Sequence, residues 1–215
     1  MRTTRRRGRT SAAKVTALAE LGPNWAIPTG PWTPEVLAAA FGRTAPVLID
    51  IGVGSGEATR AWAEARPDAS VVALELHRPG LAKLLTDLDA NGPTNVRVAE
   101  VDAVSVLGEL QPASVDAIRL LFPDPWPKRR HVARRMVDRA FVATVADALA
   151  PGGVLLLATD WVDYAEHMVT MVATDTRLVA VPVVERPDRP ETAYEARGRR
   201  AGRTITDLCF QRVGG

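Results

Sequence analysis

Two patterns of apolar and polar residues alternate through most of the chain. From residue 47 onward, short apolar runs are followed by turn residues and then by apolar residues three and four positions apart. One such helical stretch carries Leu81, Leu84, Leu85 and Leu88 on a single face. The alternation predicts an α/β fold built on a doubly wound, mostly parallel, Rossmann-like sheet. The strands predicted in this part are VLIDI (47–51), SVVALE (70–75), VRVAEV (96–101), VDAIRLLF (115–122) and VLLLAT (154–159).

The two ends of the chain depart from this alternation. Strands are predicted at 178–184 and 206–212 with no helix between them, and a parallel pair would need a long crossover. We therefore expect seven strands, the last of them antiparallel, with residues 185–203 forming a long polar loop. Before Pro34, glycine and proline interrupt any periodicity, so residues 1–45 are predicted to be a basic arm with one short helix.

Composition narrows the class of protein. Of 215 residues, 47% are apolar and 24% are charged, which is typical of a globular chain. No apolar run is long enough to span a membrane, and no apolar stretch follows the basic first residues, so we expect a cytoplasmic protein. One cysteine, Cys209, and three histidines argue against a disulfide or a His/Cys metal site.

Basic residues are concentrated in three clusters although the net charge is only +2. The clusters lie at residues 1–14, 128–139 and 197–203. Such clustering favours a local site for a polyanion, with a solvated basic surface as the alternative for each cluster.

A glycine-rich turn, DIGVGSGE, follows the first predicted strand and begins at Asp50. Gly52, Gly54 and Gly56 allow a sharp turn and a close approach of the backbone to a ligand. Glu57 stands where the dinucleotide-binding fingerprint has a glycine, which argues against a nicotinamide-dependent oxidoreductase.

Acidic residues follow the next two strands. Glu75 ends the second strand and suits the two hydroxyls of a ribose, while Asp102 and Ala103 follow the third. This set fits S-adenosylmethionine, with the adenine near Asp102, the ribose on Glu75 and the amino-acid end near Asp50 and Gly52. The alternative is a glycine turn with surface acids, but ligands bind at the strand ends of such sheets.

The segment FPDPWPKRRH (122–131) follows the fourth strand. Its three prolines predict a stiff loop that holds Asp124 and Trp126 at the mouth of the pocket. The basic residues after it suit phosphate groups. The alternative is a proline-rich connector with a core tryptophan.

Two weaker motifs lie further along, TDW (159–161) and TAYEARG (192–198). Asp160 is equally well explained as the N-cap of the following helix, and Trp161 as a core residue.

Together these motifs resemble the bacterial tRNA (guanine-N7-)-methyltransferase family, within the class I S-adenosylmethionine-dependent methyltransferases. FPDPWPKRRH is the most specific element, and DIG, LE, VDA, TDW and TAYE support it in order. The resemblance covers nearly the whole chain and implies a methyltransferase domain at residues 46–215. It also implies tRNA as the partner, S-adenosylmethionine as the cofactor, no metal, and the guanine at variable-loop position 46 as the methylated base.

The resemblance further implies roles for individual residues. Asp50, Glu75, Asp102 and Asp124 correspond to acids of the cofactor site, and Asp124 also to the active-site residue. The implied substrate contacts are Lys128, Asp160, Thr192, Ala193, Tyr194 and Glu195.

Two departures from the family pattern stand out. Asp50 replaces the usual glutamate, and Val132 and Ala133 stand where a histidine and a lysine are expected.

The expected reaction needs little acid–base chemistry. Guanine N7 has a lone pair and no proton, so catalysis rests on positioning and electrostatics. Asp124 is expected to hold the N1–H and amino group of the base, with Trp126 and Trp161 as stacking candidates. The basic arm, residues 2–14, is expected to be disordered without RNA. A non-catalytic tRNA-binding scaffold stays as the alternative function, and the sequence leaves monomer or homodimer open.

Overall fold

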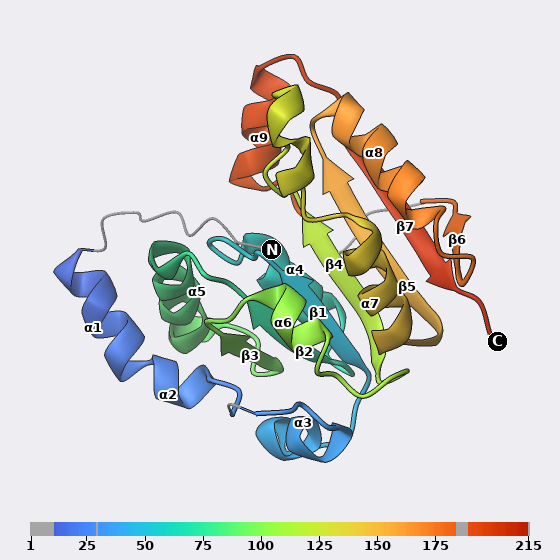
Figure 1. The fold of residues 1–215 in the computed structure, drawn as a ribbon. Coiled ribbons are helices and arrows are strands. Elements are labelled where there is room, and N and C mark those ends of the chain that lie inside the picture. The colour runs from blue at the N-terminus through green and yellow to red at the C-terminus, as the bar shows by residue number, and fades with distance from the viewer. Residues whose placement is uncertain (1–10, 29, 184–188, 215) are drawn as a thin grey trace.

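One seven-stranded sheet forms the centre of the computed structural model, which describes residues 11–28, 30–183 and 189–214. The strand order is β3-β2-β1-β4-β5-β7-β6, and β7 runs antiparallel to both of its neighbours (Figure 1). The other pairings are parallel, so the predicted doubly wound sheet with an antiparallel last strand is confirmed. The strands are β1 (Val47–Ile51), β2 (Ser70–Leu74), β3 (Val96–Ala99), β4 (Val115–Leu121), β5 (Leu149–Thr159), β6 (Leu178–Val181) and β7 (Thr206–Arg212).

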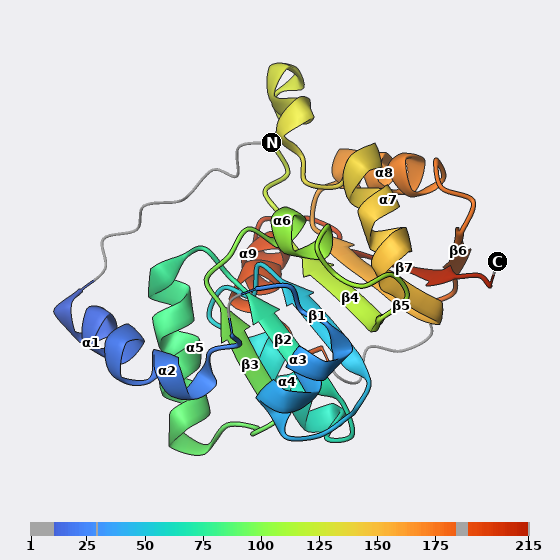
Figure 2. The same ribbon diagram turned by 60° about the horizontal axis from the view of Figure 1, so that its bottom comes forward.

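Helices cover both faces of the sheet (Figures 1 and 2). Strand residues alternate between the faces, and both faces are apolar because both are covered. The helices are α1 (Ala12–Glu20), α2 (Gly22–Trp25), α3 (Pro34–Phe41), α4 (Glu57–Ala65), α5 (Arg78–Asn91), α6 (Ala103–Leu107), the 3₁₀ helix η1 (Arg129–Arg134), α7 (Arg139–Ala148), α8 (Val162–Val172) and α9 (Ala193–Arg200).

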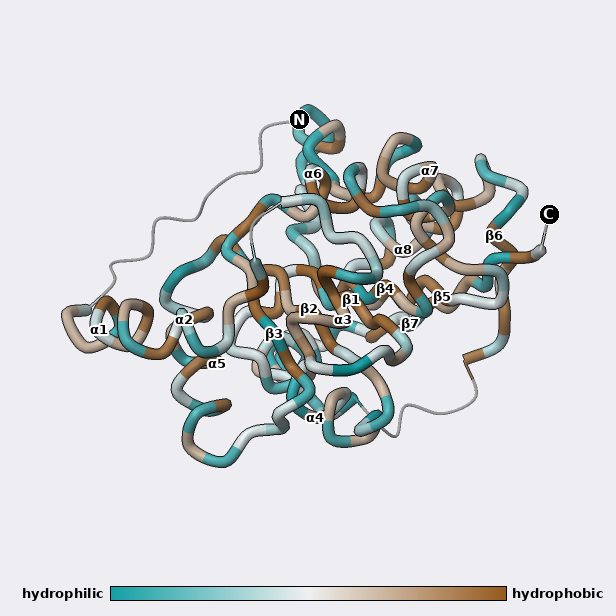
Figure 3. The backbone as a smooth tube through the Cα atoms, turned by 90° about the horizontal axis from the view of Figure 1, so that it is seen from below, coloured by the Kyte–Doolittle hydropathy of each residue, from teal (hydrophilic) through white to brown (hydrophobic). Residues whose placement is uncertain are grey.

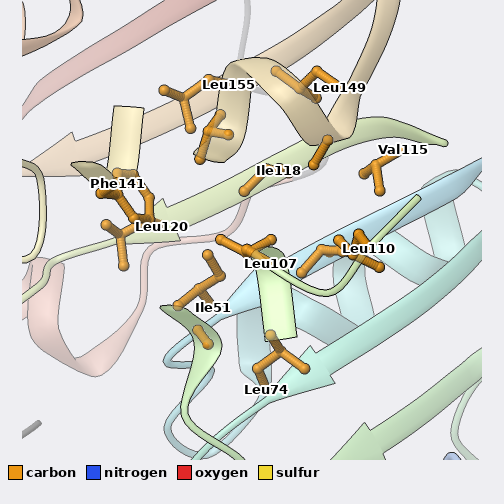
Figure 4. Close-up of a cluster of buried hydrophobic side chains, with 14 of the residues drawn as sticks. Ile51, Leu74, Leu107, Leu110, Val115, Ile118, Leu120, Phe141, Leu149 and Leu155 are labelled. Carbon is orange, nitrogen blue, oxygen red and sulfur yellow. The ribbon is translucent and has the colours of Figure 1, made fainter. Parts of the chain in front are cut away.

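Two apolar clusters fill the space between helices and sheet. On one face, Ile118 and Leu120 of β4 pack with Leu107 of α6 and Phe141 of α7 (Figure 4). On the other face, α4 and α5 pack on the alternate strand positions. Figure 3 shows that hydrophobic residues are concentrated in the central strands. The sheet is therefore a rigid platform whose strand ends can carry a site.

The prediction that no helix precedes Pro34 was wrong, because α1 and α2 lie there. α1 packs against α5, and the Ile27 amide donates to the Val98 carbonyl at the edge of β3. Tertiary contacts thus stabilise two helices whose own sequence shows little periodicity. Of the basic arm expected to be disordered without RNA, residues 2–14, residues 2–10 lie outside the described residues. The expectation was wrong for Ala12 to Lys14, which form the start of α1.

The prediction of a helix-free loop between the last two strands was also wrong. α9 lies in that segment, and its N-cap Thr192 accepts a hydrogen bond from the Glu195 amide at 3.2 Å. Five of its residues are Arg or Glu or Gly, so it shows no apolar face that would have marked it in the sequence. α9 lies beyond the carboxyl end of β4 (Figure 1).

Within the described part of the chain, no helix has the length and apolar character needed to cross a membrane. The same residues contain no group of three His, Cys, Asp or Glu placed to hold a metal ion.

Candidate active site

A cavity of about 260 Å³ opens at the carboxyl ends of the central strands. The strand order reverses between β1 and β4, which is where doubly wound sheets bind ligands. Residues from six chain segments line the cavity. Those of the predicted site are Asp50, Gly52, Gly54, Glu75, Asp102, Ala103, Asp124, Thr192 and Tyr194.

The glycine turn after β1 has the backbone that its sequence predicts. Gly52, Gly54 and Gly56 have φ angles of 69°, 57° and 77°, in the left-handed region that favours glycine. A Cβ atom on Gly52 would meet nothing within 4 Å, so the backbone there faces open space. Gly56 instead lies against the buried side chain of Leu84. The turn therefore exposes backbone to the cavity at one end and packs tightly at the other.

Glu75 connects this turn to the end of β2. Its Oε2 accepts a hydrogen bond from the Gly54 amide at 2.7 Å, and its Oε1 accepts one from the His77 amide at 2.6 Å. The carboxylate is half-buried and lines the cavity. Glu75 thus holds the glycine turn while its charge faces the pocket.

Asp50 lies beneath the cavity in a buried ion pair. Its carboxylate accepts hydrogen bonds from Arg119 Nε at 3.1 Å and Nη2 at 2.7 Å, and from the Thr59 hydroxyl at 2.7 Å. The guanidinium carbon of Arg119 lies 4.1 Å from the centroid of the Trp62 ring. Asp50 is 2% exposed, so its charge is balanced within the protein.

Asp102 follows β3 and begins α6. Its Oδ1 accepts a hydrogen bond from the Val104 amide at 3.0 Å, which makes it the N-cap of that helix. Asp102 and the buried Ala103 both line the cavity. The structure thereby brings the residues after β1, β2 and β3 to one pocket.

The loop after β4 is strained on both sides of Asp124. Phe122 and Trp126 have φ angles of 50° and 43°, which are unusual for residues with a side chain. The buried Arg135 donates from Nε to the Pro125 carbonyl at 3.0 Å and pairs with Asp163. Asp124 itself is exposed and lines the cavity. Arg135 therefore ties this loop to Asp163 of α8.

A buried tyrosine supports this loop from below. Tyr164 lies 4.8 Å from the Arg135 guanidinium carbon, measured to the ring centroid, and its hydroxyl accepts from the Val137 amide at 3.3 Å. Burial raises the pKa of Tyr164 to about 12, so the phenol stays neutral and acts in packing.

The two tryptophans proposed for base stacking are both in contact with protein side chains. The Trp126 ring lies 5.0 Å from the Arg134 guanidinium and 5.7 Å, edge-on, from the His131 ring. Trp161 packs against the core, with Arg203 5.7 Å from its ring. Neither is among the residues that line the cavity.

The start of α9 and its N-cap lie against the glycine turn and line part of the cavity. The Ala193 amide donates to Glu57 Oε2 at 3.3 Å, and Thr192 and Tyr194 line the cavity. Tyr194 is 47% exposed, and a Cβ on Gly54 would be 3.6 Å from its ring. Tyr194 is therefore the exposed aromatic residue at the pocket.

The remaining predicted contacts, Lys128, Asp160 and Glu195, do not line the cavity. Lys128 is exposed directly before η1. Asp160 pairs with Arg203 at 3.0 Å and does not cap α8, whose N-cap is Trp161. Glu195 is fully buried, unlike a side chain that contacts a macromolecule directly.

Comparison with known proteins agrees with this arrangement. Residues 44–208 match the protein family described as "Putative methyltransferase". The chain is 42% identical over 213 residues to the tRNA (guanine-N(7)-)-methyltransferase of Thiobacillus denitrificans, an alignment that covers 96% of this chain and 92% of the relative.

The chain belongs to the tRNA (guanine-N(7)-)-methyltransferase family.

Solved structures show the same fold at low sequence identity. The aminoglycoside resistance methyltransferase NpmB1 has a TM-score of 0.60 and 17% identity, covering 84% of this chain and 93% of that one. The 16S rRNA (adenine(1408)-N(1))-methyltransferase from Catenulisporales acidiphilia, in a variant solved with S-adenosylmethionine, has a TM-score of 0.58 and 16% identity, covering 88% and 96%. The predicted class I methyltransferase fold is confirmed.

Sequence reasoning missed three residues that organise the site of this methyltransferase. Arg119 lies within an apolar strand, and a buried arginine needs an acidic partner, so its position in the sequence could have indicated the pair with Asp50. The only sequence signal of Glu57 is its place at a fingerprint glycine position, yet it accepts a hydrogen bond from the Ala193 amide. Arg135 had no distinguishing signal among its basic neighbours.

Proposed function

We propose that this methyltransferase transfers a methyl group from S-adenosylmethionine to N7 of guanine 46 in the variable loop of tRNA. The observation that carries the proposal is the shared pocket, in which the glycine turn and Glu75 meet the loop of Asp124. The 42% identical relative is named for this reaction. Because tRNA is used in the cytoplasm, we propose that the enzyme acts there.

The residues of the pocket fit S-adenosylmethionine. Gly52 faces open space, so the amino-acid end of a ligand can approach its backbone, as the sequence predicts. Glu75 would accept hydrogen bonds from the ribose hydroxyls, and Asp102 with Ala103 would lie at the adenine. Asp50 would lie near the amino-acid end of the cofactor, with its own charge balanced by Arg119. When bound, the cofactor supplies an electrophilic methyl group.

Asp124 is proposed to hold the guanine. Its carboxylate would accept hydrogen bonds from the N1–H and the amino group of the base and offset the positive charge that develops on the ring. N7 already carries a lone pair, so no general base is needed. Tyr194, exposed at the same pocket, offers a ring against which an unstacked base can lie.

The basic clusters are proposed to bind the tRNA backbone. Exposed cations follow the Asp124 loop, and others belong to α9. Both segments adjoin the pocket. Lys128, Asp160 and residues 192–194 are proposed to face the substrate, and the buried Glu195 is proposed to act only through the residues it holds. The exposed cations include Lys128, Arg129, Arg130, Arg197 and Arg200.

The direct test is base mapping. Unmodified tRNA transcripts are incubated with the full-length protein and S-adenosylmethionine, then digested and analysed by mass spectrometry. We expect N7-methylguanosine at position 46 and none in a matched transcript with adenine there. Methylation at another base, or no methylation with a folded protein, would overturn the proposal.

The cofactor acid gives a first prediction. Glu75→Ala is expected to weaken S-adenosylmethionine binding by about 1.5–3 kcal/mol, the range for hydrogen bonds to a charged group. Calorimetry measures this directly. Glu64→Ala is the control, since Glu64 is an exposed acid on α4 outside the cavity. Equal dissociation constants for both variants would remove Glu75 from the cofactor site.

The basic N-terminal residues give a second prediction. Residues 2–10 contain five arginines, and each phosphate that a cation neutralises adds roughly 0.7–0.9 to the salt slope of binding. Deleting these residues is expected to lower the log–log salt slope of tRNA binding by roughly two to three units. Cofactor affinity should not change. A full-length variant with the five arginines replaced by glutamine should match the deletion, and an unchanged slope in both would contradict the prediction.

A further inference from the structure

We propose that Arg189 is a positioning residue that fixes the two substrate-facing segments of the pocket relative to each other. These segments are the loop after β4 that carries Asp124 and the first turn of α9, residues 192–195. The inference rests on the proposed function and assigns a role to a residue that neither the motifs nor the cavity lining includes.

Arg189 joins three parts of the chain through one buried guanidinium. Its Nη1 donates to Glu195 Oε2 at 2.6 Å, and its Nη2 donates to Asp207 Oδ1 on β7 at 2.6 Å. Its guanidinium carbon lies 5.5 Å from the centroid of the Phe122 ring. The side chain is only 5% exposed. One residue therefore contacts α9, the sheet and the start of the Asp124 loop.

Two of the three partners of Arg189, Phe122 and Glu195, lie in the segments that line the pocket. Phe122 lines the cavity, has a φ angle of 50° and lies two positions before Asp124. Glu195 follows Tyr194, and its amide is bound by the side chain of Thr192. A shift of the Arg189 guanidinium would therefore change the position of both segments.

The burial of Glu195 indicates the same role. Its side chain is 1% exposed, and its second oxygen accepts from Arg199 Nη2 at 2.7 Å. A carboxylate so enclosed can act on tRNA only through the backbone and side chains that it holds in place. We therefore assign Glu195 to the positioning network rather than to direct contact with the substrate.

The free energy of a buried ion pair indicates that this network orients the segments more than it stabilises the fold. Buried ion pairs contribute little net stability, because removing the charges from water costs about as much as their attraction returns. Their geometry is directional, however, because the planar guanidinium forms two parallel or divergent hydrogen bonds in a rigid fork. Such a fork fixes Glu195 of α9 and Asp207 of β7 relative to the guanidinium that lies over the Phe122 ring.

The test uses two variants in the full-length protein. Arg189→Lys keeps the charge and removes the fork. The double variant Arg189→Met/Glu195→Gln removes one charge of each sign, so that it leaves the balance of buried charge unchanged. The control is Arg177→Lys, because Arg177 also pairs with two acids, Asp147 at 2.5 Å and Asp175 at 2.7 Å, but these bonds join α7 to the segment after α8 and not the two segments of the pocket.

Two measurements separate positioning from folding and from the proposed reaction. The single-turnover rate with saturating tRNA and cofactor should fall at least about tenfold in both test variants, while the dissociation constants change less than about threefold. Amide hydrogen exchange should speed up in peptides covering 122–128 and 192–200 together, and not in β1 or β4. Arg177→Lys should change neither readout.

The outcomes are distinct. A wild-type rate in the folded test variants, or faster exchange throughout the sheet, would overturn the positioning role. If the wild-type protein methylated no tRNA but the two peptides still lost protection together, the proposed reaction would fail while the shared anchoring by Arg189 would stand.

Discussion

Asp124→Asn is expected to lower the single-turnover rate of methyl transfer by about 100-fold or more, the usual loss when a group that stabilises developing charge is removed. Asparagine has nearly the same shape but places an NH₂ donor where the guanine also presents donors. Because Asp124 is exposed on its loop, the free energy of unfolding should change by less than about 1 kcal/mol.

The rate measurement needs saturating tRNA and cofactor, so that binding does not limit the result. Asp89→Asn is the matched control, since Asp89 is an exposed aspartate on α5 that does not line the cavity. Asp124→Ala should lose activity as well, which excludes an effect of the new amide alone. Wild-type turnover in either Asp124 variant would remove this residue from the reaction.

Gly56→Ala is expected to destabilise the fold by about 2–5 kcal/mol, measured by denaturant unfolding without ligand. The new Cβ would lie 2.3 Å from Leu84 Cδ1, and Leu84 is fully buried and cannot move aside. The φ angle of 77° adds the cost of a left-handed conformation for a residue with a side chain.

Gly52→Ala is the control that separates these two costs. Gly52 has a similar φ angle of 69°, but a Cβ there would meet nothing within 4 Å. Gly52→Ala should therefore lower the free energy of unfolding by only about 1–2 kcal/mol. Equal destabilisation by the two substitutions would mean that packing against Leu84 adds nothing.

Much of the pocket could be predicted because its residues follow strands in order. Asp50, Glu75, Asp102 and Asp124 each come at or after the end of a successive apolar run. In a doubly wound sheet the carboxyl ends of parallel strands share one edge, so residues far apart in the chain meet there. The structure brings all four to one cavity, and their roles toward ligand and base stay predictions.

The elements that the sequence did not reveal are those stabilised by tertiary contacts. α1 and α2 have no buried residues and lie against α5 and the edge of β3. Half of the residues of α9 are charged, so hydrophobic periodicity could not mark it, and its first turn is hydrogen-bonded to the distant Arg189 and Glu57.

By itself, the sequence determined the fold class, the family and the edge of the sheet that carries the site, because apolar periodicity and strand-end motifs are local properties of the chain. Only the tertiary structure decided which charges face the pocket and which are balanced inside the protein. Asp50 and Arg119 are 69 residues apart, and the buried Glu195 pairs with Arg189 and Arg199. A motif shows that a carboxylate is present, but its exposure and its partners depend on how distant segments pack.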